Sequence, residues 1–76
     1  MSNVIGVKQS LLRHLPPSAQ KVYNILHHRD AMRVSDIESE TRYSYQMICF
    51  ALRRLMDQRL ISQISNTWYY SFAINR

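Results

Sequence analysis

The sequence predicts a small, mainly α-helical domain that is closed by one β-hairpin. Two observations carry this prediction. Apolar residues recur three and four positions apart over residues 44–58, which is the spacing of one buried helix face. After residue 60, apolar and polar residues alternate, and β-branched and aromatic residues are frequent, which indicates strands. A chain of 76 residues has room for one domain with a small core.

The N-terminal segment, residues 1–15, is expected to form an additional helix or arm. Apolar residues fall at helical spacing over residues 3–14, although Gly6 weakens a helix at that point. Two interpretations of this segment stay open. It either contributes a dimer contact or covers the edge of the core.

Residues 16–76 are expected to form the domain itself, beginning with a helix after two consecutive prolines. Pro16 and Pro17 end the preceding segment, because the residue before a proline is disfavoured in the helical region. Proline is tolerated in a first helical turn, so a helix is expected to start there. Its predicted buried residues are Val22, Ile25 and Leu26.

A short second helix of the domain is expected over residues 35–41. Ser35 followed by Glu38 has the capping-box pattern, in which side chains at the first turn bind free backbone N–H groups. Ile37 is then the inward residue. Residues 42–43 form the turn into the next helix, so the pair has a helix-turn-helix arrangement.

The third helix, residues 44–58, is predicted to be the working element of the protein. Ser44 is its expected N-cap, and the helix is expected to end near Gln58. Its predicted buried residues are Ile48, Ala51, Leu52 and Leu55. The core does not require the residues of the other face, which are Tyr45, Gln46, Met47, Cys49, Phe50 and Arg53. This face is therefore interpreted as a recognition surface.

The C-terminal segment is expected to form a hairpin. The strands are predicted in ISQIS and WYYSFAI, and the polar residues SNT between them supply the tip. Trp68, Tyr70 and Phe72 share one strand face because side chains alternate along a strand. These bulky side chains are expected to pack on the helices.

This order of elements resembles that of the winged helix-turn-helix domains, in which the hairpin is called the wing. The segment LRRLMDQRLI, residues 52–61, resembles the LxxLxxxGLI signature of the small MarR- and ArsR-like transcriptional regulators. SAQKVYNIL and VSDIESET resemble the first and second helices of that family. The resemblance covers about residues 16–74 and implies double-stranded DNA binding with the third helix in the major groove. Arg42 and Arg59 stand where the family usually has glycine, and residues 62–67 carry no lysine or arginine.

Under this interpretation, the candidate DNA-binding residues are Arg42, Ser44, Tyr45, Gln46, Met47, Phe50, Arg53 and Arg54. Gln46 can pair with adenine, and Arg53 with guanine or a phosphate. Met47 and Phe50 can contact thymine methyl groups, but they would serve equally as an apolar patch for a protein partner. The residues expected to hold the DNA backbone are Arg42, Tyr45 and Arg54.

Composition narrows the class of protein. Ten Lys and Arg residues against five Asp and Glu give a net charge of +5, which favours a polyanionic partner. The single cysteine, Cys49, excludes an internal disulfide framework and a thiolate zinc site, and whether it senses redox state stays open.

The sequence contains no set of residues arranged for catalysis, so neither an enzyme nor a metal or cofactor is expected. The N-terminus lacks the build of a signal peptide and no apolar run is long enough to cross a membrane, so a cytoplasmic protein is expected.

The function predicted from the sequence is sequence-specific binding of double-stranded DNA by a homodimeric transcriptional regulator. A small core favours pairing with a second copy, through the N-terminal segment or through the aromatic strand with its tail, residues 73–76. Two alternatives remain open. One is a winged-helix module that docks on a larger protein assembly, and the other is a protein that coats DNA without regard to sequence.

Overall fold

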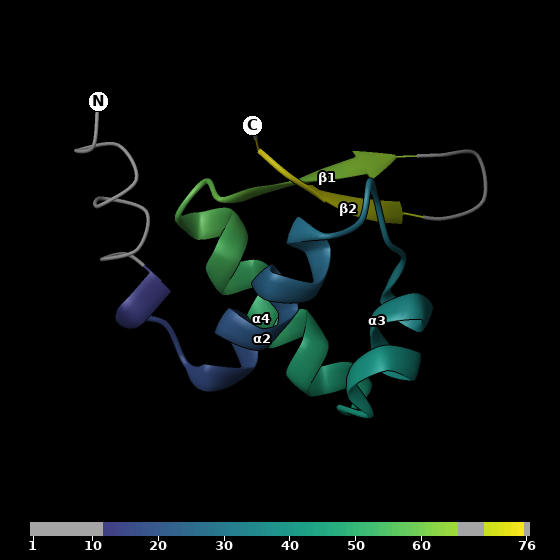
Figure 1. The fold of residues 1–76 in the computed structure, drawn as a ribbon, viewed down its shortest axis with the longest axis horizontal. Coiled ribbons are helices and arrows are strands. Elements are labelled where there is room, and N and C mark those ends of the chain that lie inside the picture. The colour runs from purple at the N-terminus through teal and green to yellow at the C-terminus, as the bar shows by residue number, and fades with distance from the viewer. Residues whose placement is uncertain (1–11, 66–69, 76) are drawn as a thin grey trace.

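The structure, a computed structural model, describes residues 12–65 and 70–75. These residues are mostly helical, with three helices followed by an antiparallel two-stranded hairpin (Figure 1). In chain order the elements are α2 (Pro17–His27), α3 (Val34–Thr41), α4 (Tyr45–Asp57), β1 (Ile61–Ser65) and β2 (Tyr70–Ile74). Of the predicted N-terminal helix or arm, Leu12 and Arg13 are helical and Leu15 is buried in the core, whereas residues 1–11 lie outside the described residues.

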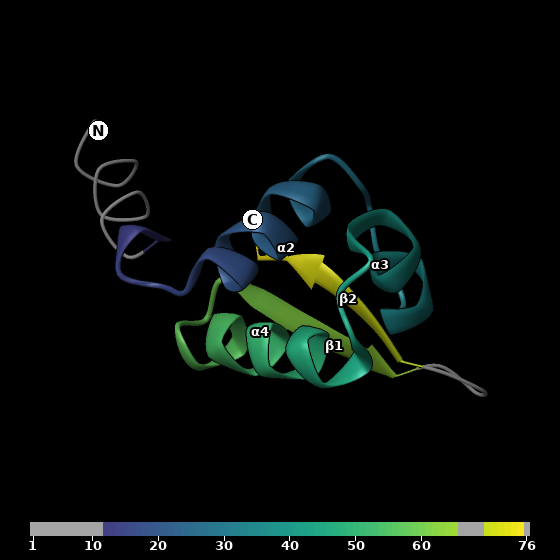
Figure 2. The same ribbon diagram turned by 90° about the horizontal axis from the view of Figure 1, so that it is seen from below.

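One hydrophobic core forms where α2, α4 and the hairpin meet. α2 packs along α4, β2 lies against α2, and β1 lies against α4. Figure 2 shows the two strands lying across α2 and α4, with α3 at one end of the molecule. The buried apolar residues come from every element and are Leu15, Ala19, Val22, Tyr23, Leu26, Met32, Ile37, Ile48, Ala51, Leu52, Leu55, Leu60, Ile61 and Phe72.

α4 has the limits and the buried face that its sequence predicts. Ser44 is the N-cap, and its Oγ accepts a hydrogen bond from the backbone N–H of Met47 at 3.2 Å. The C-cap is Gln58. The buried residues are Ile48, Ala51, Leu52 and Leu55, as predicted. Every apolar position of the predicted stripe therefore contributes to the core.

The prediction for the start of α3 was wrong. The helix begins at Val34, with Arg33 as N-cap, so Ser35 lies inside the first turn instead of capping it. The carboxylate of Asp36 accepts a hydrogen bond from the backbone N–H of Arg33 at 3.1 Å. Asp36 therefore has, relative to the N-cap Arg33, the role that Glu38 was expected to have relative to Ser35. Ile37 is fully buried, as predicted.

α2 begins at Pro17, in agreement with the expectation from the proline pair. Val22 and Leu26 are buried as predicted, whereas Ile25 is only partly buried and packs against the rim of the core. Tyr23, which the sequence analysis did not include, takes a buried position and stacks on His27 with 6.0 Å between ring centroids. The buried face of α2 is thus rotated away from Ile25 toward Tyr23.

In the described part of the chain, one isolated β-bridge links the hairpin to the connection between α2 and α3. β1 pairs with β2 in antiparallel register, with Ile61 opposite Ile74 and Gln63 opposite Phe72. On its other side, Phe72 exchanges two backbone hydrogen bonds with Met32, of 2.8 and 2.9 Å. Because Met32 lies between α2 and α3, this bridge anchors the helix connection to the sheet.

The predicted packing face of the second strand is correct for one residue and wrong for another. Phe72 is buried, but the side chain of Tyr70 is 57% exposed, and Trp68 lies outside the described residues. Tyr70 pairs with Ser65 at the end of the ladder farthest from the buried Ile61. Alternation along a strand gives the face of a side chain, but not how far the helical layer extends beneath it. Among the described residues, no helix has the length and apolar character needed to cross a membrane.

Candidate nucleic-acid interface

All eight candidate DNA-binding residues have exposed side chains. Seven of them extend from the N-cap of α4 along its length, and Arg42 precedes them in the turn after α3. Three of the exposed residues are large and apolar or aromatic: Tyr45 is 61% exposed, Phe50 52% and Met47 43%. Three such side chains exposed on one helix make this face of α4 a candidate contact surface.

Helical geometry divides the exposed face into a centre and two flanks. Successive residues are about 100° apart around a helix, so Gln46, Phe50 and Arg53 lie opposite the buried stripe. Met47 and Arg54 flank this centre on one side. Tyr45 and Cys49 flank it on the other side, and Cys49 is half-buried.

Asp57 extends the central row by one more turn, and the sequence analysis missed it. It follows Phe50 by seven residues and Arg53 by four, so helical spacing was the available signal. Its side chain is exposed. A carboxylate is repelled by a polyanion. A ligand that carries phosphates is therefore not expected to contact α4 beyond its last turn, where Asp57 lies.

Phe50 and Arg54 lie together on the surface of α4. The guanidinium carbon of Arg54 is 5.9 Å from the centroid of the Phe50 ring, within the range of a cation–π contact. The two residues are four positions apart, which brings side chains together on a helix. Arg54 therefore has its charge held over the aromatic ring next to the central row.

Tyr45 and Cys49 form a second pair at the same spacing. A hydrogen bond with the Cys49 side chain is the main cause that raises the pKa of the Tyr45 hydroxyl, and the nearby Glu38 carboxylate adds a smaller contribution. Tyr45 is 61% exposed, so its phenol lies at the surface of α4.

The turn before α4 has an unusual backbone. Arg42 adopts the left-handed conformation with φ 62°, and its N–H donates to the carbonyl of Glu38 at 2.7 Å. Glycine adopts this conformation without steric cost, whereas a residue with a Cβ is strained by about 1 kcal/mol or more. The position at which the resembled family usually has glycine is thus one that requires a positive φ, and here an arginine occupies it.

Thr41 holds this turn together, and the sequence analysis did not single it out. Its buried hydroxyl donates to the carbonyl of Ile37 at 2.8 Å and accepts from the N–H of Tyr43 at 3.1 Å. Lys21 of α2 lies 5.6 Å from the centroid of the Tyr43 ring, which places another cation beside the turn. The start of α4 is therefore fixed by contacts from both α3 and α2.

The junction between α4 and β1 repeats the same backbone feature. Arg59 has φ 58°, the second positive value of a non-glycine residue among the described residues. Asn75 fastens this junction: its side-chain amide donates to the carbonyl of Arg59 at 2.9 Å, and its backbone N–H donates to the carbonyl of Leu60 at 3.0 Å. Its side-chain carbonyl accepts from the hydroxyl of Ser62.

The hairpin differs in chemistry from α4. Residues 60–75 contain no charged side chain, and Ile64 is 43% exposed on β1. The predicted tip includes residues 66–69, which lie outside the described residues. Residues 60–75 therefore contribute no basic group to contact with a polyanion.

The chain was compared with known proteins. No protein-family model matches it, and no curated protein matches it.

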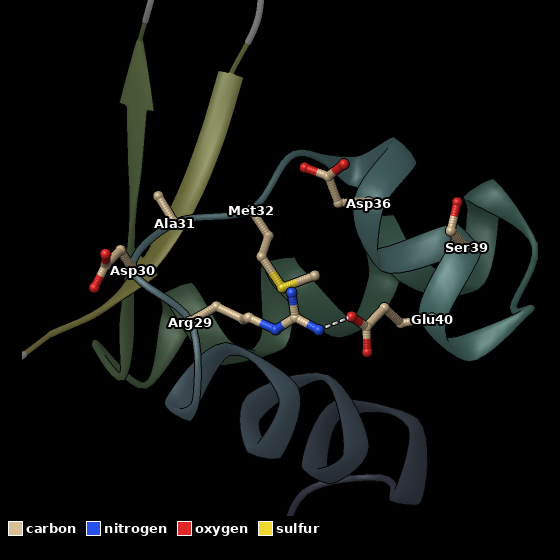
Figure 3. Close-up of a pocket in the computed structure, with 7 residues that line it drawn as sticks. All are labelled: Arg29, Asp30, Ala31, Met32, Asp36, Ser39 and Glu40. Carbon is tan, nitrogen blue, oxygen red and sulfur yellow. Dashed lines mark hydrogen bonds and ion pairs between the residues drawn. The ribbon is translucent and has the colours of Figure 1, made fainter.

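A polar hollow of about 480 Å³ lies on a different part of the surface, between the C-terminal end of α2 and α3 (Figure 3). Arg29 reaches across it to an ion pair with Glu40, and Met32 lies beneath them. Asp30 and Asp36 complete an acidic rim. None of the lining residues belongs to α4. No group of His, Cys, Asp or Glu residues in the described part of the chain has the arrangement of a metal site.

Proposed function

We propose that this protein is a winged helix-turn-helix protein that binds double-stranded DNA in a sequence-specific manner and regulates transcription. The observation that carries the proposal is the exposed face of α4. Its central row combines Gln46 and Arg53, whose side chains can each make two hydrogen bonds to a base edge. An α-helix fits the major groove of B-form DNA, and the fold does not require these side chains for its core.

The roles of the candidate residues follow from their places around α4. In the proposed complex, Gln46 pairs with an adenine and Arg53 with a guanine at the floor of the groove. Arg54, on one flank, and the hydroxyl of Tyr45, on the other, reach the two phosphate walls. Asp57 marks the end of the contact, since its carboxylate would face phosphate beyond it.

The strained turn supports the same proposal independently. Arg42 precedes the N-terminus of α4, where free backbone N–H groups and the helix dipole already favour an anion. Backbone strain tends to persist where a side chain has a function that the unstrained alternative lacks. An arginine at this position places a cation where a phosphate would lie, which glycine does not do.

The proposed functional unit is a homodimer. A two-fold dimer would present two copies of α4 to half-sites about one helical turn of DNA apart. The dimer contact is proposed in residues 1–15 or in the C-terminal strand with its tail, residues 73–76. A truncation of either segment that leaves a monomer in sedimentation measurements would identify the contact.

A protein-docking module is the second candidate, and the uncharged hairpin favours it. A hairpin with exposed Ile64 and Tyr70 and no basic residue is better suited to an apolar partner than to phosphate. Salt separates the two candidates. Log affinity for DNA falls steeply with log salt because counterions are released, whereas an apolar contact hardly responds.

The decisive experiment is selection of bound duplexes from a random DNA pool at near-physiological salt. The proposal expects an enriched inverted repeat with half-sites about 10 base pairs apart. Binding without enrichment would replace it with sequence-independent coating, and Arg53→Ala would then weaken binding to all duplexes alike. Absence of binding even at low salt would refute a role in DNA binding and leave the docking module.

A further inference from the structure

We propose that Phe50 recognises the 5-methyl group of thymine, with Met47 beside it, so that the bound sequence carries thymine opposite the middle of α4. This inference rests on the proposed function and goes one step further, because it specifies what the apolar residues of the contact face bind. Of the two interpretations that the sequence left open for these residues, it adopts contact with DNA.

The first argument is the position of Phe50 within the central row. Gln46 precedes it by one turn and Arg53 follows it by three residues, so an apolar group lies between two groups that form hydrogen bonds. In the major groove the apolar group of a base edge is the C5-methyl group of thymine, and it lies among hydrogen-bond donors and acceptors of the same and neighbouring base pairs. Gln46 and Phe50 are separated by roughly 6 Å along the helix, or about two base-pair steps of DNA.

The second argument is the cation above the ring. The guanidinium of Arg54 lies 5.9 Å from the centroid of Phe50, and the ring is still 52% exposed. Burial of this ring in an apolar pocket of a protein would also remove water from the guanidinium, which is costly without a counter-charge. Next to DNA the guanidinium meets a phosphate while the remaining ring surface meets a methyl group. The pair therefore fits a surface on which negative charge and small apolar groups alternate.

The experiment removes only the methyl groups. The best duplex from the selection, or an alternating dA·dT duplex if none is enriched, is synthesised again with deoxyuridine in place of every thymidine. We expect the wild-type protein to bind the uracil duplex about fourfold more weakly for each contacted methyl group, as expected for the burial of one methyl group. In Phe50→Ala, the ratio of the affinity for the thymine duplex to the affinity for the uracil duplex should fall toward one.

A matched control removes a similarly exposed apolar side chain that is not on α4. Ile64→Ala on β1 should keep the wild-type ratio between the thymine and uracil duplexes. Equal affinity of the wild-type protein for both duplexes would overturn the inference while leaving DNA binding intact. An affinity ratio that is the same in the wild type and in Phe50→Ala would also overturn the inference. The preference for thymine would then come from an effect of the methyl groups on DNA shape and not from contact with Phe50. If no duplex binds, the proposed function fails and this inference fails with it.

Discussion

Replacing Arg42 with glycine is expected to stabilise the fold and to weaken DNA binding at the same time. The left-handed conformation at φ 62° costs a residue with a Cβ about 1–2 kcal/mol, and glycine avoids this cost. Glycine also adds freedom to the unfolded chain, which offsets about 0.4–1 kcal/mol of the gain. The net increase in the free energy of unfolding is about 0.5–1 kcal/mol, or a rise in Tm of about 3–6 °C for a domain of this size.

The same substitution removes one proposed phosphate contact. Affinity for the selected duplex should fall by about tenfold, in line with the loss of one hydrogen bond to a charged group. The slope of log affinity against log salt should become shallower by about 0.9. Thermal unfolding and DNA titrations at several salt concentrations measure the two effects on one protein sample.

Arg59→Gly is the matched control. Arg59 has nearly the same conformation, with φ 58°, and its replacement removes the same charge, but it follows α4 and is not among the proposed contacts. It should raise Tm by a similar amount and leave the salt slope unchanged. Equal losses of affinity in the two variants would show that net charge alone matters, and would refute the proposed contact of Arg42. No rise in Tm in either variant would refute the argument from backbone strain.

Three further substitutions test the parts of the fold that position α4. Thr41→Val keeps the shape of the side chain but leaves the N–H of Tyr43 without its acceptor. The free energy of unfolding in urea should fall by about 1–2 kcal/mol. An unchanged unfolding midpoint would contradict the proposed role of the hydroxyl. Leu55→Ala empties a fully buried position and should lower the free energy of unfolding by about 2–5 kcal/mol, a large part of the total for a domain of this size; a loss below about 1 kcal/mol would mean that the core is not packed around α4. Asn75→Ala removes two exposed side-chain hydrogen bonds at the junction of α4 and β1. It should lower the free energy of unfolding by about 1 kcal/mol and speed amide hydrogen exchange at Ser62. Unchanged exchange at Ser62 would show that the junction does not depend on Asn75.

Sequence reasoning was most accurate where one periodic pattern dominated. α4 has four apolar residues at helical spacing and a serine at its start, and both its buried face and its cap agree with the structure. α3 is short and carries two patterns that compete for its N-terminus. Ser35 with Glu38 fits a capping box, but the carboxylate of Asp36 reaches the N–H of Arg33 and the helix starts earlier. Pattern matching alone does not rank two such alternatives.

Features that depend on packing between elements were harder to predict. The hydroxyl of Thr41 acts through residues on both sides of a turn, and no local motif distinguishes it from an ordinary helix residue. The exposure of Tyr70 depends on where the helical layer ends. For the candidate site, helical spacing gave the exposed face except that Cys49 is half-buried. It passed over Asp57, because attention to basic and polar residues left out the one acid of α4.

The acidic hollow beside α3 gives the molecule an uneven distribution of charge. Residues 29–40 contain four acidic and two basic side chains, whereas residues 41–59 contain four basic and one acidic. If the protein binds DNA as proposed, such a separation of charge acts as an electric dipole, and the field of the DNA would orient the approaching protein with α4 toward it. Encounters would then be productive in a larger fraction of collisions, and this gain would fade once added salt shortens the screening length to a few ångströms.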